Sequence, residues 1–219
     1  MEHSDMANVK IERTKLWPTN IYCFNTDVSI LQHHDKMETD LKVDLKQNYT
    51  EIKSGKEVGF NLYQGRDNLQ NLESFKPFTE FVKNICGGIF NQEGYEKQEI
   101  EVTQMWANLQ VDGGVHPPHT HANSLLSGVY YLRATDDTAG TQFFDPRAQA
   151  KVLKPRRANA NMENSGVWQV PSATGTGVIF PSWLQHWVPS NTDERITLSW
   201  NTIVRGEYGE PGTLQNANI

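Results

Sequence analysis

Histidines crowd one short segment of the chain, which reads His116-Pro117-Pro118-His119-Thr120-His121. Side chains alternate between two faces of an extended segment, so His119 and His121 project to the same side and can converge on one metal ion. His116 requires a different approach, because two prolines separate it from His119. A single histidine here would be expected on a solvated loop. The cluster instead directly precedes a strand-like apolar run at 125–133, where a rigid scaffold can hold ligands.

A second group of residues that could take part in chemistry lies further along the chain, where His186 precedes Arg195 by nine residues. Arg195 opens an alternating strand in which Arg195, Thr197 and Ser199 share one face. The opposite face is apolar. This pattern fits either a solvated outer surface or a lined cavity, and the periodicity leaves both open.

Two helices are predicted in the first half of the chain to support these groups. Asn25 or Thr26 caps an apolar periodicity that continues to about Gln47, and Pro77 opens a second helical stripe. Two glycines inside the second stripe weaken its helix propensity. The polar, glycine-punctuated stretch 48–70 is predicted to connect the two helices.

From residue 99 onward the sequence pattern changes to short runs rich in strand-forming residues, separated by turn residues. This pattern is typical of an all-β sandwich or barrel. The predicted strands are 100–111, 125–133, 140–144, 167–170, 178–180 and 195–204. The polar stretch 145–166 has no periodicity and is expected to form a long loop at one mouth of the barrel.

The length of 219 residues predicts one domain over 1–219. Within it, 1–98 is expected to form a helical support region, 99–205 the β core and 206–219 a C-terminal tail. The two cysteines, Cys23 and Cys86, fall in apolar runs and are expected to pack as small hydrophobes without a disulfide.

The formal net charge of −6 gives no electrostatic footprint for nucleic acid or an anionic membrane. No apolar run reaches the roughly 20 residues that span a bilayer, and the acidic, polar start lacks the apolar stretch of a signal peptide. We therefore expect a cytoplasmic protein without nucleic-acid or membrane partners.

The order of several motifs resembles one enzyme family. The motifs are His119-Thr120-His121, Val129-Tyr130-Tyr131-Leu132, Gly140-Thr141-Gln142-Phe143-Phe144-Asp145-Pro146, Gly177-Val178-Ile179-Phe180-Pro181, His186 and Arg195. Together they resemble the iron(II) and 2-oxoglutarate-dependent dioxygenases, within the prolyl-hydroxylase-like group that includes many uncharacterised bacterial and phage proteins. The resemblance spans about 105–204.

The resemblance implies a mainly β fold, a double-stranded β-helix or jelly-roll barrel, with the N-terminal helices packed on one sheet. It implies that His119 and His186 bind Fe(II) and that Arg195 pairs with the distal carboxylate of 2-oxoglutarate, a task that suits the guanidinium fork. The further residues implied in cosubstrate binding are Tyr131 and Thr197 beside that carboxylate, and Asn108 and Trp106 toward the other end.

One position departs from the family's usual pattern. The third ligand is usually Asp or Glu, whereas His121 stands there in this chain. Asp145 and His116 are the alternative ligands. We expect His121 to be the third ligand and Asp145 to cap the turn Asp145-Pro146-Arg147.

The implied reaction consumes O2 and 2-oxoglutarate and releases succinate and CO2, with a peptidyl or amino acid side chain as the leading substrate class. Trp183, Trp187 and Phe144 are candidates for an apolar shell around the metal. Two other readings stay open. A three-histidine iron site also occurs in cupin-type dioxygenases that do not use 2-oxoglutarate, and a jelly roll can serve as a non-catalytic binding module.

Overall fold

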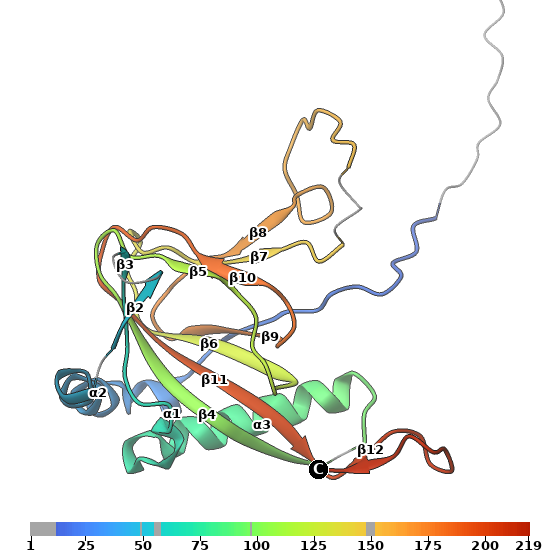
Figure 1. Ribbon diagram of the computed structural model, residues 1–219, viewed down its shortest axis with the longest axis horizontal. Helices are drawn as coiled ribbons and strands as arrows, with labels where there is room; N and C mark the ends of the chain where they lie inside the picture. The colour runs from blue at the N-terminus through green and yellow to red at the C-terminus, as the bar shows by residue number, and fades with distance from the viewer. Residues whose placement is uncertain (1–11, 49, 55–57, 97, 148–151) are drawn as a thin grey trace, which may run out of the picture.

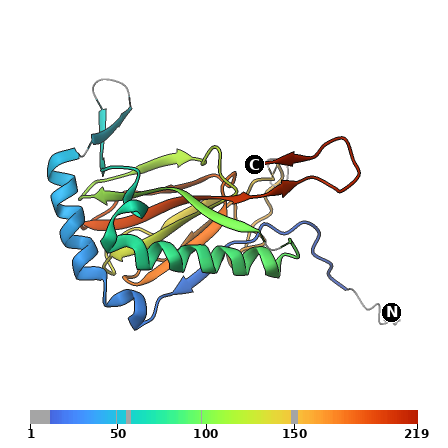
Figure 2. The same ribbon diagram turned by 90° about the horizontal axis from the view of Figure 1, so that it is seen from below.

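The computed structural model describes residues 12–48, 50–54, 58–96, 98–147 and 152–219. Two β-sheets face each other, and helices cover the outer face of the larger one (Figures 1 and 2). The fold is therefore mainly β and of the jelly-roll kind. The sheets remain separate, so it is an open sandwich rather than a closed barrel.

The larger sheet has seven strands, and every neighbouring pair is antiparallel. In spatial order they are β1 (Tyr22–Asn25), β9 (Thr176–Pro181), β6 (Leu126–Arg133), β11 (Arg195–Arg205), β4 (Glu99–Gln110), β3 (Val58–Gln64) and β2 (Thr50–Ser54).

The smaller sheet has four antiparallel strands. In spatial order they are β5 (His116–His119), β10 (His186–Val188), β7 (Thr141–Phe144) and β8 (Val167–Val170). Outside both sheets, β12 (Glu207–Tyr208) pairs with β13 (Ala217–Asn218).

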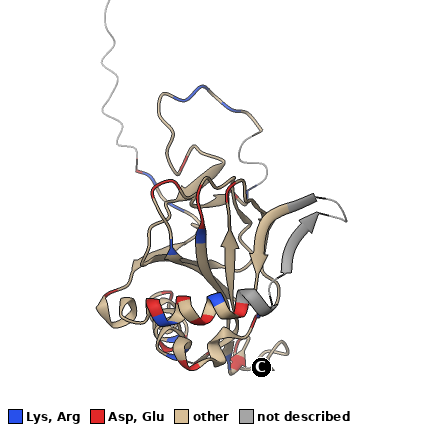
Figure 3. Cartoon of the chain, turned by 90° about the vertical axis from the view of Figure 1, so that its left-hand side faces the viewer, with Lys and Arg blue, Asp and Glu red and all other residues tan. Residues whose placement is uncertain are grey.

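The helical elements precede β4 in the chain. They are α1 (Val28–Leu31), α2 (His34–Asn48), the 3-10 turns η1 (Leu69–Asn71) and η2 (Glu73–Phe75), and α3 (Lys76–Gln92). Charged residues are frequent on the helical layer and on the loops at the opposite end of the molecule (Figure 3). The strands between them carry few charges, as expected for surfaces buried on both sides.

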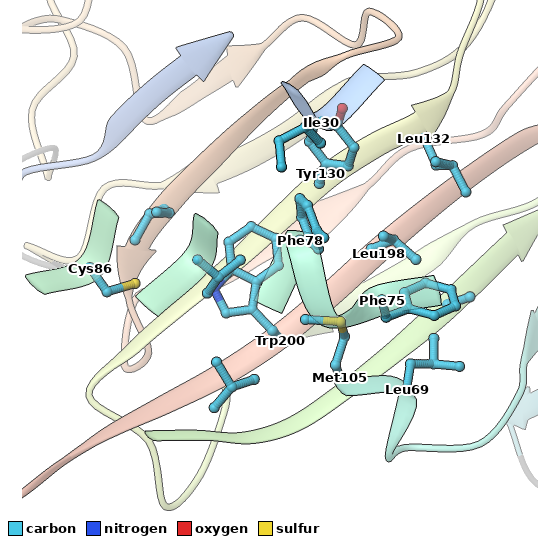
Figure 4. Packing of buried hydrophobic residues seen from close by; sticks show 14 of the residues in the cluster. Ile30, Leu69, Phe75, Phe78, Cys86, Met105, Tyr130, Leu132, Leu198 and Trp200 are labelled. Carbon is cyan, nitrogen blue, oxygen red and sulfur yellow. The ribbon is translucent and has the colours of Figure 1, made fainter. Parts of the chain in front are cut away.

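Strand β11 lies at the centre of the larger sheet and is buried along nearly its whole length. Its residues Leu198 and Trp200 pack toward the helices in the main apolar core (Figure 4). The Trp200 ring meets Phe78 of α3 edge-on at 5.6 Å between centroids. Gly128 lies opposite Trp200 in β6, and a Cβ there would come within 2.1 Å of the indole. The absence of a side chain at Gly128 therefore lets the tryptophan lie flat on the sheet.

Three expectations for the first half of the chain were wrong in detail. The predicted first helix is split into α1 and α2, and its N-cap is Asp27, which accepts from the backbone of Ser29. Thr26 instead continues the contact with the larger sheet, through backbone and side-chain hydrogen bonds of 2.9 Å to the carbonyl of Gly175. The stretch 48–70, which was predicted to be a connection, contains β2 and β3.

The second helix was correctly predicted, since α3 runs through both of its glycines without interruption. Cys23 and Cys86 are free thiols, and only Cys86 is buried. In the described part of the chain, no helix is long and apolar enough to cross a membrane.

Candidate metal centre

Three histidines of the predicted site meet at one end of the smaller sheet. His119 ends β5, His186 begins β10, and the two residues are paired across the antiparallel strands. His121 lies two residues after His119, and its backbone N–H donates to the carbonyl of Ser182 at 2.9 Å. One ligand nitrogen from each of the three rings lies within 4.8 Å of the others. The spacing of the sequence thus produces a single compact group.

Hydrogen bonds fix the same tautomer in all three rings. Each Nδ1 faces an oxygen: the carbonyl of Pro117 for His119 at 2.8 Å, and the carbonyl of Leu184 for His186 at 3.0 Å. His121 Nδ1 faces Oδ1 of Asn201 at 2.6 Å. These oxygens accept only, so each Nδ1 carries the proton and each Nε2 keeps its lone pair. Protein histidines that ligate metals are commonly oriented in this way.

Burial keeps the three rings neutral. It lowers the pKa of His186 from 6.5 to about 3, and the positive charge that His119 would carry adds to the effect. Burial likewise lowers the pKa of His121 to about 4 and shifts the pKa of His119 downward. Metal ligation requires neutral imidazole, so the site is prepared for a cation without releasing protons near neutral pH.

The two alternative ligands lie outside this group. His116 stacks on His119, with ring centroids 4.2 Å apart, but it is not among the residues whose ligand atoms converge. Asp145 accepts the backbone N–H of Arg147 at 3.1 Å and forms an ion pair with its guanidinium at 3.0 Å. This is the turn-capping role expected for Asp145.

Arg195 carries a buried positive charge at the start of β11. It is only 2% exposed, and desolvation lowers the pKa of its guanidinium. The guanidinium carbon lies 5.0 Å from the centre of the Tyr131 ring, and Nη1 donates to Oε1 of Gln110. Among the described residues, no carboxylate forms an ion pair with Arg195, and its Nε has no hydrogen-bond partner. A buried cation of this kind is costly unless an anion joins it.

The other predicted cosubstrate residues lie on β11 and on neighbouring strands of the larger sheet. They share with Arg195 the face that is turned toward the smaller sheet, here called the inner face. Thr197 is buried and lies between Asn108 of β4 and Tyr131 of β6 in the register of the sheet. The Tyr131 hydroxyl is 2.9 Å from Oγ1 of Thr141. The structure therefore brings Tyr131 and Thr197 beside Arg195, as predicted.

Trp106 and Asn108 differ in what they can still offer a ligand. The Trp106 ring lies 5.6 Å from that of His121, and its buried Nε1 has no partner among the described residues. Asn108 already donates to Oγ of Ser199 at 2.9 Å and accepts from Gln64 at 2.7 Å. Trp106 is thus the freer donor of the two.

The unsatisfied polar atoms test whether the site fits iron and 2-oxoglutarate. In the described part of the chain, buried side-chain atoms without a partner include Nε2 of His121, Nε of Arg195 and Nε1 of Trp106. The first is a lone pair suited to a metal, and the other two are N–H donors suited to carboxylate oxygens. Such atoms require an explanation in a folded protein. A metal with a dicarboxylate cosubstrate would satisfy all three.

The apolar shell around the histidines comes from residues other than those expected. Phe180 and Phe143 lie 4.6 Å and 5.8 Å from the His186 ring, between centroids. Trp187 and Phe144 follow inward-facing residues of β10 and β7, so they project to the other face of the smaller sheet. There their ring centroids lie 6.3 Å apart. Trp183 is 58% exposed. Side-chain alternation in the short strands decides this result.

The sequence analysis missed two residues that contact the candidate site, Asn201 beside His121 and Gln110 beside Arg195. A signal existed for Asn201, because it continues the polar face of β11 that begins with Arg195 and Thr197. Gln110 ends β4 opposite Arg195, and that pairing depends on the strand register, which the sequence alone does not show.

A surface cavity of about 1160 Å³ lies elsewhere, between α3 and the β12–β13 pair, with Gly87, Tyr95 and Tyr208 among its lining residues. None of the three histidines lines it. Side-chain chemistry rather than cavity volume therefore identifies the site.

Comparison with solved structures shows the same fold at low sequence identity. A prolyl-4-hydroxylase from Pseudomonas putida superposes with a TM-score of 0.57 at 13% identity, covering 85% of this chain and 94% of that one. A prolyl hydroxylase from Trichoplax adhaerens, in complex with a peptide fragment of hypoxia inducible factor, gives 0.57 at 13% identity over 83% and 82%. HygX from Streptomyces hygroscopicus, with nickel, 2-oxoglutarate and hygromycin B bound, gives 0.56 at 9% identity over 84% and 82%.

At the level of sequence, none of the curated proteins matches the chain. A family model described as "Putative 2OG-Fe(II) oxygenase" matches residues 104–201. That range contains the three converging histidines, Arg195 and the inner-face residues of β4, β6 and β11. Over this range, which is slightly less than half of its length, the chain is similar to the 2OG-Fe(II) oxygenases, a family of oxidoreductases that use iron and 2-oxoglutarate.

Proposed function

We propose that His119, His121 and His186 bind Fe(II) through Nε2, and that Arg195 binds the distal carboxylate of 2-oxoglutarate. The observation that carries this proposal is the set of unsatisfied buried atoms on His121, Arg195 and Trp106. The oxidation is the chemistry that iron and 2-oxoglutarate supply when bound, with O2 consumed and succinate and CO2 released.

The protein's own residues hold and orient the reactants. Three neutral imidazoles held by their Nδ1–H bonds occupy fixed positions, so little reorganisation accompanies metal binding. Arg195 fixes one end of the cosubstrate in a pocket from which solvent is excluded, where a charge-assisted pair is strong. Phe143 and Phe180 exclude water from one side of the histidines.

For the primary substrate we propose a peptidyl or amino acid-like side chain. The support is the fold shared with prolyl hydroxylases, one of which was solved with a bound peptide fragment. A screen of peptides and free amino acids tests this class, with succinate release above the substrate-free level as the readout. Turnover confined to small molecules unrelated to amino acids would reject it.

The metal assignment is tested by anaerobic Fe(II) titration of the purified protein. Wild type should bind about one ion per chain, and His186→Ala should lose binding because two remaining ligands give little affinity. His121→Asp should keep iron by forming two histidines and one carboxylate. The matched controls are His116→Ala and, in the link between α1 and α2, His33→Ala; both should bind normally. Iron binding by His186→Ala at wild-type affinity would reject the site.

The cosubstrate assignment is tested by calorimetry of 2-oxoglutarate binding to the metal-loaded protein. Arg195→Ala should weaken binding by about 2–5 kcal/mol, since it removes a desolvated charge pair, and should leave metal affinity nearly unchanged. Arg195→Lys should recover only part, because an ammonium lacks the planar fork. Unchanged affinity in Arg195→Ala would favour a three-histidine dioxygenase that does not use 2-oxoglutarate.

A further inference from the structure

Arg195 contacts the Gln110 amide and the Tyr131 side chain, and neither of them carries a carboxylate. Gln110 stands directly opposite Arg195 in the pairing of β4 with β11, and its Oε1 accepts from Nη1 of the guanidinium. Both side chains are buried, at 1% and 2% exposure. An amide oxygen satisfies a guanidinium N–H without cancelling its charge, whereas a carboxylate would do both.

A rigid turn determines which end of the Gln110 amide faces Arg195. Nε2 donates to the carbonyl of Gly114 at 3.2 Å, and the same carbonyl accepts from the backbone N–H of Asn191 at 2.9 Å. A Cβ at Gly114 would come within 2.7 Å of the Val111 carbonyl, so the turn accepts only glycine. Because a carbonyl only accepts, Nε2 must face Gly114 and Oε1 must face Arg195.

The acidic residues nearest to Arg195 in sequence are engaged elsewhere. Glu194 pairs with Arg133 at 2.9 Å, and Asp193 accepts from the hydroxyl of Thr135 at 2.9 Å. The charge of Arg195 is therefore left uncancelled by the described residues, while one of its N–H groups is held in place.

We propose that Gln110 is a positioning residue for cosubstrate binding: it orients the Arg195 guanidinium and, being neutral, reserves the full positive charge for the incoming carboxylate. This inference rests on the proposed role of Arg195 and adds the specificity element behind it. A dicarboxylate is favoured because its distal group supplies the missing negative charge. A neutral 2-oxo compound of the same length does not.

Two substitutions that introduce side chains about as long as glutamine separate the effect of added charge from the effect of lost hydrogen bonds. Gln110→Glu retains an acceptor and adds an internal counterion for Arg195. Gln110→Met removes both hydrogen bonds and adds no charge. A purely structural role predicts that the two variants weaken 2-oxoglutarate binding equally, or that Met is the worse. A charge-reserving role predicts a much larger loss for Glu.

The experiment is calorimetry of 2-oxoglutarate binding to metal-loaded wild type and variants. We expect a few-fold loss for Gln110→Met and a loss on the order of tenfold to a hundredfold for Gln110→Glu, with metal affinity unchanged in both. Gln169→Glu is the matched control, because it places the same charge in an exposed glutamine that accepts from Gln142 at 2.9 Å. It should bind 2-oxoglutarate like wild type.

The outcomes distinguish this inference from the proposed function. If Arg195→Ala loses 2-oxoglutarate but Gln110→Glu binds it normally, or loses no more than Gln110→Met, the role of Gln110 is overturned and that of Arg195 stands. If Arg195→Ala binds normally, the carboxylate pocket is wrong and the inference falls with it. A loss in Gln169→Glu as large as in Gln110→Glu would reduce the effect to net charge and also overturn it.

Discussion

The two faces of β11 are both buried, yet they are filled in opposite ways. The face that contacts the helices carries Leu198 and Trp200 and packs with aromatic rings of α3 and β6. The inner face carries Arg195, Thr197 and Asn201 among polar neighbours. Apolar burial stabilises the first face directly, whereas each polar group on the second costs free energy unless it finds a partner. Stability and chemistry are thus divided between alternate residues of one strand.

The inner face shows how closely its polar groups are matched. Asn201 accepts from Ser127 at 2.8 Å and donates to Gln104 at 3.1 Å while holding His121. The Ser127 hydroxyl also lies 2.8 Å from that of Ser182. Around this face, the buried side-chain atoms without a partner among the described residues are Nε of Arg195, Nε2 of His121 and Nε1 of Trp106, where a ligand is proposed to bind. The difference between the faces therefore marks the site more clearly than the histidines alone.

The largest expected effect concerns the apolar face. Trp200→Ala should lower the free energy of unfolding by about 3–5 kcal/mol, because a fully buried ring is replaced by a cavity. The molecules that remain folded should still bind metal, because His121 and its partner Asn201 face the other side. Chemical denaturation with a parallel metal titration checks both. Trp17→Ala, at an 89% exposed tryptophan, is the control and should change stability by less than about 0.5 kcal/mol.

A fall in pH should lower the stability of the fold through the histidines His186 and His121. The pKa values of His186 and His121, about 3 and about 4 in the folded state, lie below the ordinary 6.5, so the unfolded chain takes up protons first. Their stability contribution is full above about pH 6.5 and is lost as the pH falls through their folded pKa values. The metal-free protein should lose up to about 1.4 kcal/mol per pH unit for each histidine.

Urea denaturation in the presence of a chelator, at pH values from 7 to 5, measures this slope. His186→Gln keeps a buried polar side chain of similar size without a titrating ring, so it should show a shallower slope than wild type. Equal slopes in the two proteins would mean that His186 is protonated alike in the folded and unfolded chains.

Much of this arrangement could be predicted from sequence because it depends on local periodicity. The two-residue spacing of His119 and His121 places both rings on one side, and α3 follows its apolar stripe despite two glycines. The jelly-roll fold followed from the order of the motifs. Alternation in β11 predicted two distinct faces, but not that the polar one is buried.

The remainder depended on contacts between segments far apart in the chain. Gln110 acquires its role only because β4 pairs with β11 in one register, and Phe143 faces His186 only because β7 pairs with β10. Strands β2 and β3 come from a polar, glycine-containing stretch. Their antiparallel pairing stabilises them as strands, because the stretch has too few apolar residues to do so. Local propensity carries no information on such pairings.

The smallest expected effect, and the sharpest test of the division between faces, concerns Asn201. This residue is adjacent to Trp200 in β11, but its side chain points to the other face and holds His121 Nδ1 at 2.6 Å. Asn201→Ala frees the His121 ring to rotate and to change tautomer. Loss of such an outer hydrogen bond typically weakens metal affinity by about tenfold to a hundredfold.

The result should separate metal affinity from fold stability. Asn201→Ala should lower the free energy of unfolding much less than Trp200→Ala, because it leaves polar partners rather than a large apolar cavity. Asn201→Asp keeps an acceptor for His121 Nδ1–H and should retain most of the metal affinity. Competition of each variant with a metal chelator gives the affinities. If Asn201→Ala and Asn201→Asp bound metal equally well, His121 would need no hydrogen-bond acceptor on β11 to hold its ring in place, and the inner face would contribute packing alone.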